Sequence, residues 1–201
     1  MTHSTGEDPH AFRAVLRNRL IAAREALPAA EHARLSREIE RHLAALVGVL
    51  RPAVLAFCWP FRAEFDARPL VTRRLGGGLR ACLPVVVDNG RPLAFRAWTP
   101  ESEMVEDRYG IHVPAQGESL RPDVILMPLN AFDGAGYRLG YGGGYFDRSL
   151  AALSPSPRAI GVGFELARVD SIRPQAYDLP MDFVVTEAGM FVVKNGRLEL
   201  L

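Results

Sequence analysis

The chain has 201 residues, of which 48% are hydrophobic and 23% charged, and its formal net charge is +1. This length suits a single domain with a substantial core. The balanced charge gives no overall attraction to nucleic acid or to a membrane, so we expect neither as a partner and look for local electrostatic function. Residues 1–13 contain no apolar signal core and no apolar run approaches about 18 residues, which predicts a cytoplasmic protein.

Two helices are predicted at the start of the chain. Residues 1–8 are polar and are expected to be disordered, whereas residues 9–201 are expected to form one domain. Apolar residues recur at helical spacing over residues 10–27 and again, after Pro28, as far as Leu50. Both segments are therefore interpreted as amphipathic helices that bury one face.

Short apolar runs bounded by proline, glycine or polar residues predict the strands. Buried parallel strands are expected at residues 53–59, 123–127 and 158–164, because each is a continuous apolar run of strand length. Further helices are expected over about residues 67–76 and from near Tyr145 onward. This alternation of strands and helices indicates a mainly parallel sheet that is covered on both faces.

Two Asn-Gly pairs predict the turns of β-hairpins. One hairpin is expected within residues 80–98 and turns at Asn89-Gly90, and the other turns at Asn195-Gly196 near the end of the chain. Hairpin strands pair antiparallel, so they make the sheet mixed.

The two cysteines do not suggest a disulfide framework. Cys58 and Cys82 each lie in an apolar, strand-like run. We expect two reduced, buried thiols, with a single bridge or a reactive thiol as the alternative.

A glycine-rich segment, PLNAFDGAGYRLGYGGGYFDR, follows a predicted buried strand at residues 128–148. Ligands of open α/β sheets bind beyond the carboxyl ends of the strands, and successive glycines can turn their N–H groups inward around an anion. A helix that begins near Tyr145 would add the positive field of its N-terminus. Arg138 can donate to phosphate oxygens, and Asp147 can hold Mg²⁺. The segment therefore predicts a phosphate-binding loop, with a flexible surface loop or an ordinary glycine-rich turn as the alternative.

Two common nucleotide-binding motifs do not fit this segment. A P-loop ends in G-K-[ST], and the segment contains no lysine. The dinucleotide fingerprint G-x-G-x-x-G, started at Gly140, has Tyr145 at its last position.

The pattern AFDxxGYRLGYGGGYFDR at residues 131–148 resembles the signature of the 5-formyltetrahydrofolate cyclo-ligase family. The likeness extends to the first predicted helix and to the segments PFRAEFD, YGIHVP, GVGF and DFVVTE. It implies an enzyme that converts 5-formyltetrahydrofolate to 5,10-methenyltetrahydrofolate with ATP and Mg²⁺ and releases ADP and phosphate. The implied fold is a three-layer α/β/α sandwich with a mainly parallel mixed sheet, similar to ribose-5-phosphate isomerase and CoA transferases.

The predicted phosphate ligands begin on the first helix. Arg13 and Arg17 are one turn apart and share a face with Arg24, so the first two can clamp one anion or form a solvated helix face. The family has a lysine at the position of Arg13, and the resemblance implies that this pair contacts nucleotide phosphates. Catalytic roles are expected for Arg138 and Tyr145. The residues that the resemblance assigns to ATP binding are Arg13, Arg17, Arg138, Leu139, Gly140, Tyr141, Gly142, Gly143, Gly144, Tyr145 and Phe146.

The predicted folate site centres on Glu64. Glu64 can accept hydrogen bonds from a pterin ring while the indole of Trp59 stacks on it, although an ordinary loop carboxylate has the same sequence appearance. The resemblance assigns pterin binding to Glu64. The residues expected to contact the substrate are Trp59, Glu64, Tyr145 and Phe146, with Phe61 as a further wall.

The resemblance assigns metal binding to Asp147 and Asp178. Besides Arg13, four residues depart from the family pattern, namely Leu129, Ala167, Arg173 and Tyr177, where the family has glycine, glutamine, proline and histidine. These departures leave two alternatives open, a regulator that binds nucleotide or folate without turnover and an ATP-dependent ligase acting on another pterin or amide. We expect ATP as co-substrate, Mg²⁺ as cofactor, a reduced folate as substrate and a monomeric protein.

Overall fold

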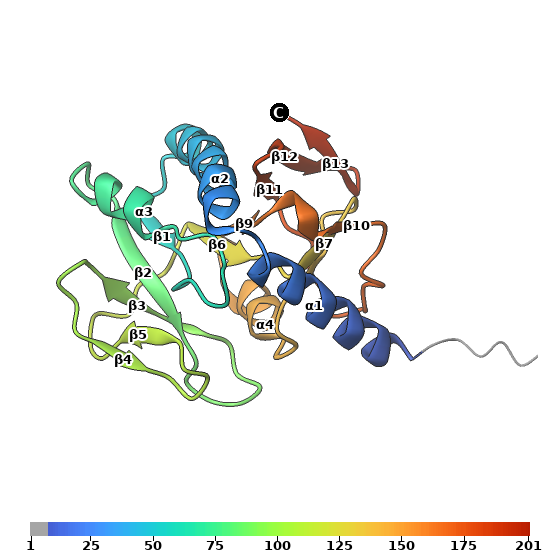
Figure 1. Ribbon diagram of the computed structural model, residues 1–201. Helices are drawn as coiled ribbons and strands as arrows, with labels where there is room; N and C mark the ends of the chain where they lie inside the picture. The colour runs from blue at the N-terminus through green and yellow to red at the C-terminus, as the bar shows by residue number, and fades with distance from the viewer. Residues whose placement is uncertain (1–7) are drawn as a thin grey trace, which may run out of the picture.

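The computed structural model describes residues 8–201 (Figure 1). Residues 1–8 were expected to be disordered, and all of them except Asp8 lie outside the described range. The Asp8 side chain accepts a hydrogen bond from the N–H of His10 at 3.0 Å and so caps the first helix. Within the described range, no helix is both long enough and apolar enough to cross a membrane.

All the predicted helices are present. Pro9 occupies the first turn of its helix, where a missing N–H costs nothing, and the second helix ends at Arg51, which has a φ of 46°. The third stops at a glycine, Gly76. The α-helices are α1 (Pro9–Glu25), α2 (Ala29–Leu50), α3 (Arg68–Leu75) and α4 (Tyr145–Ala152), and a short 3₁₀ helix, η1, spans Glu165–Ala167.

An eight-stranded sheet in the order β13-β12-β11-β9-β6-β1-β2-β3 forms the centre of the molecule. The five strands from β11 to β2 run parallel, and the strands outside them, β3 at one edge and β12 and β13 at the other, pair antiparallel. The predicted mainly parallel, mixed sheet is therefore confirmed. Its strands are β1 (Val54–Ala56), β2 (Arg80–Val85), β3 (Ala94–Trp98), β6 (Val124–Pro128), β9 (Arg158–Val162), β11 (Phe183–Thr186), β12 (Gly189–Lys194) and β13 (Arg197–Leu200).

Helices cover both faces of this sheet (Figure 1). Because successive strand residues point to opposite faces, Leu55 and Phe57 pack with α2 and α3, whereas Ala56 belongs to the cluster that contains α4 residues. A third, smaller cluster joins Leu16 and Leu20 of α1 to the region around the glycine-rich segment. The layering is the α/β/α arrangement expected from the sequence.

Substitution of Phe57 tests the core cluster that this residue forms with α2 and α3. Its side chain is 0% exposed, and its ring meets that of Trp98 edge-on with centroids 5.0 Å apart. We expect Phe57→Ala to lower the free energy of unfolding by about 3–5 kcal/mol, because buried apolar area is lost and a cavity is left. Urea denaturation followed by circular dichroism measures this change. Val49→Ala, at an exposed position of α2, is the control and should stay within about 0.5 kcal/mol of wild type. A loss below about 1 kcal/mol for Phe57→Ala would contradict the placement of Phe57 in the core.

The predicted hairpin near the end of the chain is confirmed. Asn195 and Gly196 alone join β12 to β13, and their φ angles are 49° and 71°. Positive φ at both central residues is what a tight two-residue turn requires.

The hairpin formed by β2 and β3 has a longer turn than expected. The chain turns near Asn89-Gly90, as predicted, but the strands stop short of that pair, which lies within residues 86–93. Part of this loop is held by α4, because the N–H of Leu93 donates to Ser149 Oγ at 2.8 Å. A tertiary contact thus sets the strand ends here.

The first half of the glycine-rich segment forms a hairpin that was not predicted. Strands β7 and β8 pair antiparallel, and β10 pairs with β7 in parallel. Asp133 fixes the turn, since its carboxylate accepts from the N–H groups of Ala135 and Tyr137 at 3.1 Å and of Ile172 at 3.2 Å. Arg138 is thereby placed on a strand. The small sheets consist of β7 (Ala131–Asp133), β8 (Arg138–Leu139) and β10 (Arg168–Val169), and of β4 (Met104–Glu106) with β5 (His112–Pro114).

The two thiols are free, as predicted. Cys82 is buried and Cys58 partly buried. Burial raises the pKa of both thiols, that of Cys82 to about 12, so neither is a reactive thiolate at neutral pH.

Candidate functional site

The glycine turn (residues 140–144) lies between the β7–β8 hairpin and α4, in the segment that follows the carboxyl end of β6. Gly142 and Gly144 have φ angles of 100° and 63°, a region that favours glycine. A Cβ atom at Gly143 would lie 2.6 Å from the ring of Tyr145, so a larger residue there requires that ring to move. The turn leads directly into α4, and the expected helix start at Tyr145 is confirmed.

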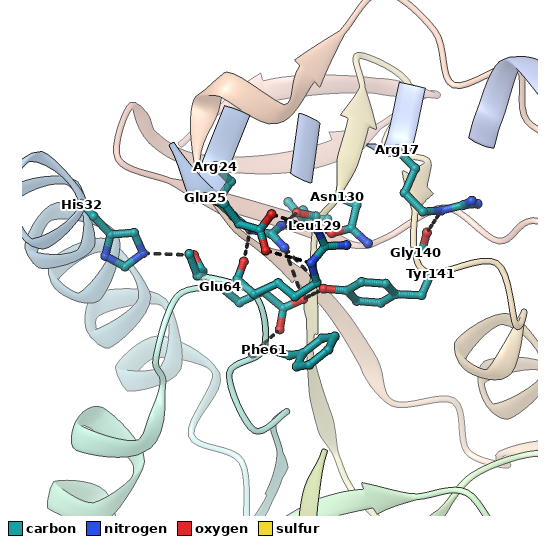
Figure 2. Close-up of polar contacts among 12 residues, drawn as sticks. Arg17, Arg24, Glu25, His32, Phe61, Glu64, Leu129, Asn130, Gly140 and Tyr141 are labelled. Atoms are coloured by element: carbon teal, nitrogen blue, oxygen red, sulfur yellow. Dashed lines mark hydrogen bonds and ion pairs between the residues drawn. The ribbon is translucent and has the colours of Figure 1, made fainter. Parts of the chain in front are cut away.

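Arginine side chains surround the glycine turn. Arg17 Nε donates to the carbonyl oxygen of Gly140 at 2.6 Å, as Figure 2 shows, and an Arg148 guanidinium nitrogen donates to that of Gly143 at 2.6 Å. Burial and the nearby charge of Arg13 lower the pKa of Arg17. The two cations repel one another, so an anion bound near Arg17 would be favourable.

Two of the predicted phosphate ligands pair with the two predicted metal ligands. Arg13 donates to both carboxylate oxygens of Asp178, at 2.7 and 3.2 Å. Arg138, which is 7% exposed, lies 3.1 Å from Asp147 Oδ1. Leu179, the residue that follows Asp178, links the two pairs: its carbonyl accepts from Arg138 at 3.1 Å and its N–H donates to Asp147 at 3.0 Å. Both arginine–aspartate pairs therefore lie together at one end of the site.

Asp147 and Asp178 are the carboxylates predicted to bind magnesium, and carboxylate oxygens are a type of ligand that suits this ion. In nucleotide sites Mg²⁺ takes one or two protein carboxylates and completes its shell with phosphate oxygens and water. Asp147 and Asp178 are each paired with an arginine in this structure, and arginine also binds phosphate. Both oxygens of Asp178 accept hydrogen bonds, from Arg13 and from the Gln175 N–H, so a metal ion would replace these donors. No group of three or more His, Cys, Asp or Glu residues suited to a metal occurs within residues 8–201, so the protein ligands there do not form a complete metal cage.

Glu64 forms the other end of the site (Figure 2). Its side chain is buried, and its two carboxylate oxygens accept hydrogen bonds from the Tyr141 hydroxyl at 2.7 Å and from the Phe61 N–H at 3.0 Å. Burial raises the pKa of Glu64, and the hydrogen bond from Tyr141 and the charge of Arg24, 3.8 Å away, oppose this rise. The glycine turn thus contacts Glu64, the carboxylate predicted to bind the pterin, through Tyr141.

The predicted aromatic walls lie in different surroundings. The ring of Trp59 is stacked with that of His112 at a centroid distance of 5.4 Å, and the Arg68 guanidinium lies 4.2 Å from the indole centroid. Phe61 instead meets the ring of Tyr141 edge-on at 5.9 Å. Phe61 therefore lies with the glycine turn, while Trp59 is engaged by two other side chains.

The remaining predicted residues lie around the start of α4. The hydroxyl of Tyr145 is 2.9 Å from that of Tyr109, and this hydrogen bond raises the pKa of Tyr145. The ring of Phe146 has the Arg138 guanidinium 5.9 Å from its centroid. Leu139 is 1% exposed in the small cluster beside α1, and its carbonyl accepts a hydrogen bond from the N–H of Asn130 at 3.1 Å.

Arg24 is a site residue that the sequence did not assign. It is 4% exposed and lies on α1, on the same face as Arg13 and Arg17. The position of Arg24 on this shared face could have indicated a role in the site, but the sequence does not show which segments pack against the face. The acceptors of the Arg24 guanidinium are the carbonyl of Arg62 at 2.9 Å, the carbonyl of Leu129 at 3.1 Å, Asn130 Oδ1 at 3.0 Å and the Tyr141 hydroxyl at 3.3 Å (Figure 2).

The fold and the site together define an α/β protein with a glycine turn, contacted by arginine side chains, in the segment that follows the carboxyl end of β6. The family model of the 5-formyltetrahydrofolate cyclo-ligase family matches residues 9–187. The chain belongs to this family. The resemblance inferred from the glycine-rich segment is therefore confirmed, and with it the expectation of an enzyme.

Individual relatives agree with this assignment. A 5-formyltetrahydrofolate cyclo-ligase of Escherichia coli K12 is 34% identical over 133 residues, which cover 63% of this chain and 73% of that protein. A Haemophilus influenzae protein of the same name is 24% identical over 176 residues, 84% of this chain and 94% of its own. The solved structure of Aquifex aeolicus 5,10-methenyltetrahydrofolate synthetase matches with a TM-score of 0.78 and 29% identity, covering 92% of this chain and 95% of that one.

Proposed function

We propose that the protein catalyses the ATP-dependent cyclisation of 5-formyltetrahydrofolate to 5,10-methenyltetrahydrofolate, with release of ADP and phosphate, as a monomer in the cytoplasm. The observation that carries this proposal is that one short turn reaches both ends of the site. Gly140 is bonded to Arg17, and the adjacent Tyr141 is bonded to Glu64. A triphosphate at the glycine turn and a pterin at Glu64 would therefore be neighbours, as transfer between them requires.

The proposed triphosphate site combines side chains with the backbone. Arg13, Arg17 and Arg138 supply permanent positive charge. In the described part of the chain, none of the N–H groups of residues 140–144 donates a hydrogen bond, and no side chain caps the start of α4. These donors and the positive end of the helix support binding of an anion.

The proposed reaction makes limited demands on the protein. The formyl oxygen attacks the γ-phosphate of ATP and ADP leaves. N10 then closes on the formyl carbon and releases its proton, and phosphate departs with the formyl oxygen and can carry that proton away. The formyl oxygen is itself the nucleophile, so no general base is needed to activate it. The protein contributes by orienting the two ligands and neutralising charge on the transferred group, with Arg138 and Tyr145 beside the transfer point.

Asp147 and Asp178 are the proposed ligands of Mg²⁺, which when bound neutralises charge on phosphate oxygens. We expect Asp147→Asn to raise the Mg²⁺ concentration needed for half-maximal activity by about tenfold, because a neutral amide replaces a charged ligand. A Mg²⁺ titration at fixed ATP measures this change. Asp182→Asn, which alters an arginine–aspartate pair outside the proposed site, is the control. An unchanged titration for Asp147→Asn would argue against metal binding there.

One assay tests the proposed function directly. Purified protein is mixed with ATP, Mg²⁺ and 5-formyltetrahydrofolate, and the absorbance of the methenyl product is followed together with ADP. Formation of both supports the proposal. Binding of ATP without product would indicate a regulator, and ATP hydrolysis only with another pterin or amide would indicate a different ligase.

A further inference from the structure

We propose that Tyr141 is a latch that couples binding of the folate to binding of the nucleotide. In this structure the Tyr141 hydroxyl donates to the Glu64 carboxylate and covers it. A pterin that bonds to Glu64 therefore has to displace Tyr141. This inference rests on the proposed function, because it assumes that the pterin binds at Glu64 and the triphosphate at the glycine turn.

The first step is the position of Tyr141 relative to Glu64. The carboxylate is 7% exposed, whereas Tyr141 is 42% exposed, so Tyr141 is the outer member of the pair. Their hydrogen bond is 2.7 Å long, and the second carboxylate oxygen is engaged by the backbone of Phe61. Burial and the charge of Glu64 raise the pKa of Tyr141, which keeps its hydroxyl protonated as a donor. A flat heterocycle therefore reaches Glu64 by replacing this donor.

The second step is that Glu64 is the fixed partner. Arg24 is buried and bonded to the carbonyl oxygens of Arg62 and Leu129, on two different segments, and it lies 3.8 Å from Glu64. Its contact with the Tyr141 hydroxyl is longer, at 3.3 Å. Arg24 thus acts as a positioning residue for Glu64, and the residue that moves is Tyr141.

The third step connects Tyr141 to the phosphate end. Tyr141 lies between Gly140, whose carbonyl is bonded to Arg17 at 2.6 Å, and Gly142, where an added Cβ would lie 3.3 Å from the same guanidinium. Movement of Tyr141 therefore changes how the glycine turn meets Arg17. Both ligands act on one short element, so each is expected to favour the open latch and to strengthen binding of the other by the same factor.

The test compares Tyr141→Phe with Tyr137→Phe. Each variant loses one hydroxyl from the same segment, and within residues 8–201 the Tyr137 hydroxyl makes no hydrogen bond, so Tyr137→Phe is a matched control. The affinity for β,γ-imido-ATP with Mg²⁺ is measured by calorimetry with and without 5-formyltetrahydrofolate, and the reverse titration is then made. For wild type and Tyr137→Phe we expect each ligand to tighten the other about fivefold or more. For Tyr141→Phe we expect a factor below about two, with the folate alone bound as tightly as by wild type or more tightly.

The outcomes separate this inference from the proposed function. If Tyr141→Phe keeps the wild-type coupling, or weakens folate binding equally with and without nucleotide, Tyr141 is not a latch. If wild type binds both ligands independently, the inference fails while the proposed function stands. If wild type binds neither ligand, the proposed function fails and the inference fails with it.

Discussion

Arg138→Ala is expected to lower kcat/KM by about 100-fold or more, because it removes a charge that stabilises the transferred phosphate. Arg138 is 7% exposed, is bonded to Leu179 and is paired with Asp147, so its guanidinium is held in place before any ligand arrives. A preorganised charge in a site shielded from water acts more strongly than one in solution. The replacement also leaves the Asp147 carboxylate without its cation, which weakens the same end of the site.

Steady-state kinetics with ATP and 5-formyltetrahydrofolate measure this loss. The matched control is Arg158→Ala, which breaks an arginine–aspartate pair at an exposed position and should leave kcat/KM within about twofold of wild type. Thermal unfolding of both variants shows whether the protein remains folded. An Arg138→Ala enzyme within about threefold of wild type would remove Arg138 from the mechanism.

Glu64→Gln is expected to weaken binding of 5-formyltetrahydrofolate by about 10- to 100-fold, because a hydrogen bond to a charged group is replaced by one to a neutral amide. Nucleotide alone should bind with nearly unchanged affinity. Calorimetric titration of each ligand distinguishes the two effects. Glu118→Gln, which alters an exposed ion pair with Arg80, is the control. Equal loss of both ligands would mean that Glu64 supports the fold rather than the pterin.

The same substitution has an effect on stability that depends on pH. Burial raises the pKa of Glu64, so the folded protein holds this proton more tightly than the unfolded chain does. The protonated Glu64 side chain therefore contributes to the free energy of unfolding of wild type. This contribution is fully present below the ordinary pKa that a glutamate has in the unfolded chain, and it is lost as pH rises through the raised pKa of the folded protein. Glu64→Gln lacks this contribution. The difference in unfolding free energy, variant minus wild type, should become more positive as pH rises through that window; urea denaturation across the window measures it, and a flat difference would contradict it.

Much of the fold followed from local patterns. The runs at residues 53–59 and 158–164 contain β1 and β9, and the run at residues 123–127 overlaps β6, which extends to Pro128. These runs were visible because a strand buried on both faces is apolar along its whole length. The Asn195-Gly196 turn was also predictable, since few residues tolerate positive φ at both positions. The β7–β8 hairpin was not, because strands of three and two residues are too short to show a period. Asp133 stabilises that hairpin by bonds that no local pattern specifies.

The candidate site also has parts that could be predicted from the sequence and parts that could not. The glycine turn and its flanking Arg138 and Asp147 could be predicted because they are consecutive in sequence and carry a family signature. The pairing of Arg13 with Asp178 and the contacts of Arg24 could not, since each joins residues that are distant along the chain, 165 positions apart in the first case. Such partners are decided by how α1 packs, which depends on the whole fold.

The packing of α1 has a consequence for how the site is assembled during synthesis. This helix is made before the segments that it contacts, because its arginines meet partners that lie later in the chain, as far as Asp178. It is attached through its own small cluster, while the two larger clusters are built mainly from the rest of the chain. The Arg13–Asp178 pair can therefore form only after most of the residues of the two larger clusters have been made.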